Sequence, residues 1–138
     1  MVSVYLIIEV RSYREALERT LEASGQDVVG VADHPLAAIW EIEVIQPDVT
    51  LMGASGPDAP RWVREIREAA PDTSVLAIGV GEAEREILAW AEAGVGGYLG
   101  RDASLLELTG AIEAIARGEA PCHPRTWPSA PSATTRRG

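Results

Sequence analysis

Hydrophobic residues fall into two kinds of segment that alternate along the chain. Short, nearly continuous runs rich in β-branched residues predict strands at Val2–Glu9, Asp27–Ala32, Asp48–Met52, Ser74–Ile78 and Gly97–Leu99. Longer segments with helical spacing of apolar residues predict helices at Arg14–Ser24, Pro35–Gln46, Pro60–Ala70, Glu82–Ala93 and from the Ser104 cap to Gly118. This strict alternation predicts an α/β fold, and the continuous apolar strands favour a parallel sheet that helices cover on both faces.

The helix predicted at Pro35–Gln46 differs from the others because apolar residues occur almost all round it. One interpretation is a helix that is well covered within a tight domain. The other is a partner or dimer surface, because exposed apolar patches tend to mark interaction sites. The sequence favours the covered helix and leaves the interaction surface open.

Capping signals precede two of the predicted helices. Ser104 and Glu107 have the spacing of a capping box. Asp33 and His34 follow the second strand, and we interpret them as a turn and a helix cap rather than as a metal or catalytic pair.

Length and composition fit one domain with an extension. The chain has 138 residues, and we expect a domain at 1–118 and a linker or disordered tail, rich in Pro, Ser and Thr, at 119–138. The 46% of hydrophobic residues argues against wholesale disorder, and the single cysteine excludes an internal disulfide. The apolar runs are too short for a membrane span and no signal peptide is evident, which predicts a soluble, cytoplasmic protein without membrane contact.

The charge balance is acidic. Twelve basic residues, all arginine, stand against 21 acidic ones, which gives a net charge of −9. Because an acidic surface repels phosphate groups, we expect no direct nucleic-acid binding by this domain.

Four segments together carry a family resemblance. In their order and spacing they resemble the receiver domain of two-component response regulators, closest to receivers that precede LuxR or NarL helix-turn-helix domains; the segments are Pro47–Pro57, Ala70–Gly79, Ala93–Asp102 and Ala111–Glu119. The resemblance covers about residues 2 to 118. It implies a flavodoxin-like three-layer fold, with five helices and a five-stranded parallel sheet of order 2-1-3-4-5.

The same resemblance identifies the residues of the family's phosphorylation pocket. Receivers accept a phosphoryl group on an aspartate at the end of the third strand, beside an acidic pair that holds magnesium. The acceptor position is Gly53, and the acidic pair falls on Ile8 and Glu9. Gly79 stands at the switch hydroxyl and Arg101 at the lysine. Because glycine has no carboxylate and magnesium needs several oxygen ligands, we predict a degenerate pocket with no metal and no cofactor.

One alternative acceptor and one ion pair follow from these positions. Asp58 lies near the acceptor loop, but it is better placed to cap the following helix than to accept phosphate. Glu9 and Arg101 are expected to face each other across the crevice. Either they form an ion pair that replaces the family's acid–lysine contact, or both are solvated at its rim.

Two aromatic residues are candidates for contacts with other proteins. Tyr98 matches the family's switch aromatic, and with Trp90 it is expected on the face that receivers use for output or dimerisation. We therefore expect a homodimer, and the tail leaves room for an output domain or a partner protein.

These observations predict a degenerate, phosphorylation-independent receiver domain that acts in signal transduction or transcriptional regulation through protein contacts. The alternative is a small-molecule sensor with its ligand in the vacated acceptor crevice, which the two glycines favour. Enzyme activity is not expected, because no nucleophile–base pair or multi-ligand metal cluster is evident.

Overall fold

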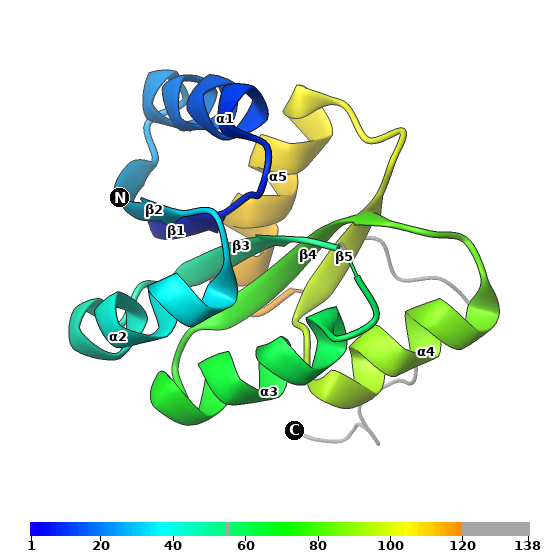
Figure 1. Ribbon diagram of the computed structural model, residues 1–138. Coiled ribbons are helices and arrows are strands. Elements are labelled where there is room, and N and C mark those ends of the chain that lie inside the picture. Colours follow the sequence, from blue (N-terminus) through cyan, green and yellow to red (C-terminus); the bar gives the residue numbers. More distant parts are fainter. Residues whose placement is uncertain (55, 120–138) are drawn as a thin grey trace.

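The structure, a computed structural model, describes residues 1–54 and 56–119, and in this part strands and helices alternate strictly (Figure 1). The strands are β1 (Ser3–Ile7), β2 (Asp27–Ala32), β3 (Val49–Gly53), β4 (Ser74–Val80) and β5 (Gly97–Gly100). The helices are α1 (Arg11–Ala23), α2 (Pro35–Ile45), α3 (Ala59–Ala69), α4 (Glu84–Ala93) and α5 (Leu105–Ala116). All neighbouring strands are parallel, in the order β2-β1-β3-β4-β5. The predicted elements and the flavodoxin-like sheet are confirmed.

The helices cover both faces of the sheet, as the continuous apolar strands predicted. Helices α1 and α5 lie on one face, and α2, α3 and α4 lie on the other (Figure 1). Each face has its own buried cluster, one built around α1 and α5 and one around α2, α3 and α4. Because successive strand residues point to opposite faces, each strand contributes to both clusters.

Several element ends near the carboxyl edge of the sheet differ from the prediction by one to three residues; the first strand, for example, ends at Ile7 rather than Glu9. Helix α1 begins at Arg11 rather than Arg14. Strand β4 continues to Val80, and its pairing with β5 shifts register between Ile78 and Val80. Gly79, at this irregularity, has a φ of 77°, a left-handed conformation that glycine adopts without steric cost.

One long-range hydrogen bond and one local cap position α2. The hydroxyl of the fully buried Tyr5 donates a hydrogen bond to a carboxylate oxygen of Glu41. At the start of the helix, Nδ1 of His34 accepts a hydrogen bond from the backbone N–H of Leu36 at 3.0 Å, which confirms the predicted cap.

The favoured interpretation of α2 as a covered helix is wrong. Leu36, Trp40 and Val44 are 70%, 82% and 79% exposed. The helix turns Ala38 and Ile42 toward the sheet, and among residues 1–54 and 56–119 nothing covers the apolar residues on its other side. The exposed apolar surface, which the sequence left open, is therefore present.

Beyond α5 the structure describes only the first residue of the predicted tail. Glu119 forms an exposed salt bridge with Arg117 at 3.1 Å. The remainder of the 119–138 segment lies outside the described residues. Within the described part, none of the helices is both long and apolar enough to cross a bilayer.

Candidate functional site at the carboxyl ends of the strands

Four of the five predicted pocket residues lie together. Ile8, Glu9, Gly53 and Gly79 follow or end strands β1, β3 and β4, and they line one crevice of about 170 Å³. This is the edge at which open parallel sheets bind ligands, because the loops there diverge to opposite faces. These four positions therefore lie together, as expected. Their role in a phosphorylation pocket remains a prediction.

The floor of the crevice is apolar and compact. Ile8 is only 3% exposed. A Cβ atom built on Gly53 would lie 3.7 Å from Cδ1 of Ile8 and 3.8 Å from the carbonyl oxygen of Ile7. Because these are ordinary van der Waals distances, a Cβ methyl group fits at position 53.

The backbone around the crevice is held by two hydrogen bonds. The N–H of Ala54 donates to the carbonyl oxygen of Ile78 at 2.8 Å, which fixes the loop after β3 against β4. The guanidinium of Arg14 donates to the carbonyl oxygen of Ile8 at 2.7 Å. A cation on α1 therefore holds the turn after β1 through its backbone and leaves the carboxylate of Glu9 exposed.

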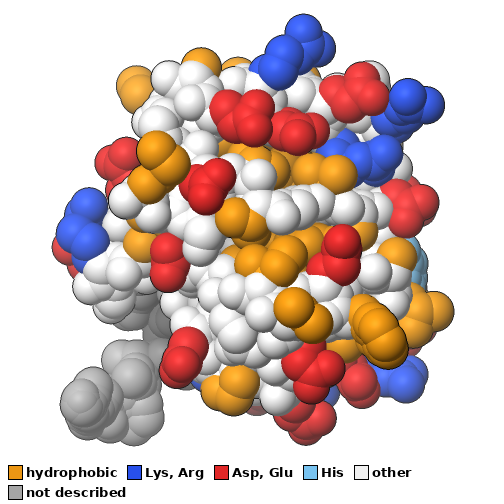
Figure 2. Space-filling view, turned by 90° about the vertical axis from the view of Figure 1, so that its left-hand side faces the viewer, with side chains coloured by type: hydrophobic (Ala, Val, Ile, Leu, Met, Phe, Trp, Pro, Cys, Tyr) orange, Lys and Arg blue, Asp and Glu red, His pale blue; other side chains and the backbone are white. Residues whose placement is uncertain are grey.

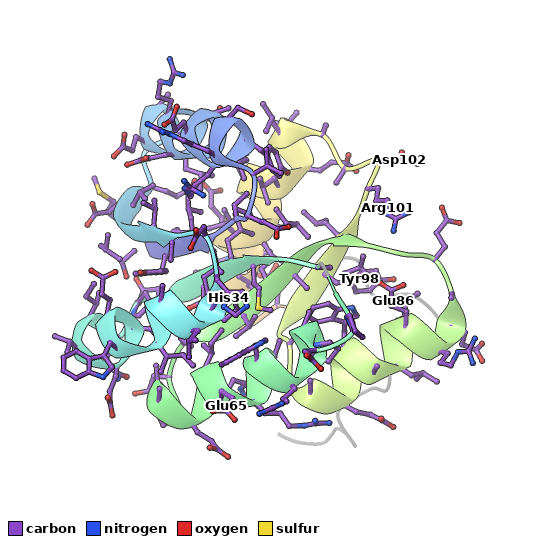
Figure 3. All side chains as sticks on the ribbon, viewed as in Figure 1. His34, Glu65, Glu86, Tyr98, Arg101 and Asp102 are labelled. Carbon is purple, nitrogen blue, oxygen red and sulfur yellow. The ribbon has the colours of Figure 1, made fainter. Side chains whose placement is uncertain are left out.

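Arg101 does not line this crevice, although it shares a small neighbouring hollow with Gly79 and Tyr13. It follows β5 and lines a different groove, of about 660 Å³, together with Ala54 and residues of α4 such as Glu86 (Figure 3). Among residues 1–54 and 56–119, no salt bridge joins Glu9 to Arg101. The ion-pair hypothesis is therefore wrong: the two side chains line separate hollows and both are exposed, as the alternative of solvated charges at the rim expected.

Known proteins resemble this fold and sequence. No family model matches the chain. The transcriptional regulatory protein DegU of Brevibacillus brevis is 25% identical over 127 residues, which are 90% of this chain and 54% of DegU. The response regulator GacA of Pseudomonas viridiflava is 29% identical over 125 residues, 86% of this chain and 57% of GacA. The chain thus spans about half the length of the curated relatives that it matches.

Solved structures agree with these relatives. The receiver domain of the putative response regulator NarL from Mycobacterium tuberculosis superposes with a TM-score of 0.78 at 29% identity, covering 86% of this chain and 98% of that domain. A two-component response regulator of the LuxR family from Aurantimonas superposes at 0.79 with 27% identity, covering 87% of this chain and 89% of that one. The chain has the fold of a response-regulator receiver domain.

The side chains at the crevice of this receiver domain do not fit a magnesium ion. Glu9 supplies the one carboxylate among the described residues that line it, and Ile8 supplies only carbon. The described residues contain no cluster of three or more His, Cys, Asp or Glu side chains that could hold a metal. Because magnesium requires an octahedral set of oxygen ligands, no step through the metal is derived for this site.

Three side chains near the pocket were not anticipated from the sequence. Tyr13, on α1, lines the crevice, and burial raises the pKa of its hydroxyl. Glu86 accepts a hydrogen bond from the N–H of Gly81 at 3.0 Å and so ties the start of α4 to the loop after β4. Arg85 joins Arg101 along the larger groove. Only the helical positions of Tyr13 and Glu86 next to strand ends could have suggested such roles.

The two aromatic candidates of the receiver domain have different environments. Trp90 is 2% exposed and belongs to the buried cluster under α4. The expectation that its ring lies on a contact face is wrong, because the helix turns it toward the sheet. Tyr98 is partly buried, packs against the same cluster and lies on β5 below Arg101 (Figure 3).

Asp58 occupies the N-cap position of α3, as its place in the sequence predicted. Its side chain makes no capping hydrogen bond, so the capping role expected of the carboxylate is not present. The helix instead begins with a proline in its first turn, which needs no hydrogen-bond acceptor for its nitrogen.

Proposed function

We propose that this receiver domain is degenerate: it works without phosphorylation and regulates through protein contacts. The observation that carries the proposal is Gly53 at the end of β3, next to the buried Ile8. At the end of β3, where the family carries its acceptor aspartate, Gly53 offers no carboxylate. An acyl phosphate needs a carboxylate, and neither residue can supply one.

The backbone at β4 supports the same conclusion. The position that corresponds to the family's switch hydroxyl is Gly79, whose left-handed backbone disfavours any side chain with a Cβ. A hydroxyl there would need both a substitution and a change of backbone conformation. The backbone at Gly79 therefore supports the proposal that this chain works without the switch hydroxyl.

The proposed output is through other proteins. The curated relatives are about twice as long as the matched region, so an output domain following residues 119–138 is part of the proposal, as are a homodimer and a cytoplasmic location. The net charge of −9 argues against direct contact between this domain and DNA.

A small-molecule sensor is the second candidate, and one observation favours it. The groove of about 660 Å³ beside α4, lined by Arg85 and Arg101, lies within the size range of ligand sites, roughly 300–1,000 Å³. The crevice at Gly53, at about 170 Å³, is smaller than that range. A ligand role would therefore use the groove beside α4 and not the vacated acceptor position.

Intact mass spectrometry after incubation with acetyl phosphate and magnesium tests the leading proposal. We expect no phosphoryl adduct on this chain under conditions in which a conventional receiver domain, run in parallel, becomes modified. A labile adduct would overturn the proposal, and fragment masses would then show whether Asp58 or another carboxylate accepts the group. Thermal unfolding in the presence of small organic anions, which would suit Arg85 and Arg101, tests the second candidate through a rise in the midpoint.

A further inference from the structure

The outer side of α2 carries an apolar stripe that the fold of this chain does not use. Leu36, Trp40 and Val44 recur at every fourth residue, so they form one ridge about 12 Å long on the helix surface. All three are at least 70% exposed. We call these three residues the α2 stripe.

The orientation of α2 is fixed by contacts on its other side. Ala38 and Ile42 are fully buried against the sheet. The hydrogen bond from Tyr5 to Glu41 joins the helix to β1, at the centre of the fold. Because these contacts determine which side faces inward, the α2 stripe faces outward in the folded chain and is not the result of a loosely attached helix.

The chain segment that contains the stripe is acidic, whereas the neighbouring helix α3 carries Arg61, Arg64 and Arg67 beside Glu65 and Glu68. From Thr20 to Pro60 the chain contains seven acidic residues and no lysine or arginine. Figure 2 shows the face of the molecule that contains β2 and α2, with hydrophobic side chains over the lower part and acidic side chains among them. Glu43, on α2 itself, is exposed beside the stripe.

This charge pattern favours one kind of binding partner for the apolar ridge over another. A second copy of the chain, related by a two-fold axis, would bring the same acidic segment against itself and place like charges in contact, which opposes association. A partner with lysine or arginine beside its apolar residues would meet opposite charges. A ridge of residues four apart packs best into the groove of another helix.

We propose that the α2 stripe is the docking site for a basic amphipathic helix of another protein, with the acidic residues around it selecting the partner's charge. The docking is separate from the crevice, because it uses the outer side of a helix that covers one face of the sheet and needs no phosphoryl group (Figure 1). Trp40 is the central anchor, since a tryptophan in the middle of an apolar contact contributes most when it becomes fully covered.

A titration with synthetic helices tests this proposal on the full chain. The probe is a peptide of leucine and lysine with leucines at helical spacing, and its counterpart replaces every lysine by glutamate. We expect the basic peptide to shift the amide resonances of residues 36–45 in ¹⁵N spectra, saturably and less tightly as salt rises. The acidic peptide should leave them unchanged.

Matched variants distinguish binding at the α2 stripe from non-specific hydrophobic binding. Trp40→Ser should weaken the basic peptide about tenfold or more, whereas Leu106→Ser, at a residue on α5 that is equally 82% exposed, should leave affinity unchanged. Glu43→Arg should weaken binding more than Glu113→Arg, which changes the net charge by the same amount on the opposite face. Circular dichroism confirms that each variant is folded.

Three outcomes would overturn the proposal. Equal binding of the two peptides would show that charge does not select the partner. Shifts centred outside α2, or equal losses in Trp40→Ser and Leu106→Ser, would place the contact elsewhere. Sedimentation of the chain alone as a dimer that Trp40→Ser dissociates would make a second copy the occupant.

Discussion

The crevice at the strand ends and the outer side of α2 differ in how their surfaces relate to the fold. At the crevice, Ile8 and Gly53 stand where the family resemblance places carboxylates, and the surface there is small and compact. On α2, Leu36, Trp40 and Val44 face water, and no described residue of the chain covers them. One region offers apolar surface that the fold buries, and the other carries apolar side chains that the fold leaves exposed.

This difference distinguishes residues whose type is explained by packing within the fold from residues whose type is not. Ile8 is explained by folding alone, since it packs into the cluster under α1 and α5. Folding does not explain Trp40, because a hydrophobic side chain left in water contributes no burial energy to the native state. This contrast agrees with the docking role that we propose for α2.

Two tryptophans on the same face of the sheet sharpen the comparison most strongly. Trp90→Ala is expected to lower the free energy of unfolding by about 3–5 kcal/mol, because it removes a buried indole and leaves a cavity. Trp40→Ala is expected to change it by less than about 0.5 kcal/mol, since that ring is exposed. Urea unfolding followed by circular dichroism measures both. Similar losses would mean that Trp40 is covered in solution and would remove the contrast.

The two glycines of the crevice give a smaller effect and test the pocket. Gly79→Ala is expected to cost about 1–2 kcal/mol, because it forces a Cβ into the left-handed region. Gly53→Ala, in an ordinary conformation with its nearest contact at 3.7 Å, is expected to be neutral to within about 0.5 kcal/mol. The same unfolding measurement compares them. A loss at Gly53 as large as that at Gly79 would show that position 53 cannot accept a side chain.

The sequence predicted the fold well and the surface poorly, for physical reasons. Continuous apolar runs and the Ser104–Glu107 capping box are local signals; the box is present, with hydrogen bonds of 2.8 and 3.0 Å. The outward side of α2 is different, because a helix that is apolar all round contains no signal for which side faces the sheet. That choice depends on Tyr5, 36 residues away in sequence.

The candidate site shows the same division. Positions 8, 9, 53 and 79 could be placed together because parallel strand ends meet at one edge of the sheet. The left-handed backbone of Gly79 and the separation of Arg101 from Glu9 could not be predicted, because they depend on a register shift and on loop paths. Trp90 was misplaced because helical spacing alone does not tell a buried ring from a half-buried one.

The contact that holds α2 in place predicts the smallest effect, a dependence of stability on alkaline pH. Burial, and then the hydrogen bond to Glu41, raise the pKa of the Tyr5 hydroxyl above its ordinary value of 10.0. The unfolded chain therefore loses this proton first, so the stabilisation is complete below about pH 10 and is lost as pH rises above it.

Tyr5→Phe should lower the free energy of unfolding by about 1 kcal/mol at neutral pH, through the lost hydrogen bond, and should flatten the decline at alkaline pH. Tyr13→Phe serves as the control, because burial alone raises the pKa there, and it should retain most of the decline. If Tyr5→Phe and the unmodified chain lose stability in parallel above pH 10, the Tyr5–Glu41 contact does not hold α2 in solution, and the outward orientation of the α2 stripe loses its main support.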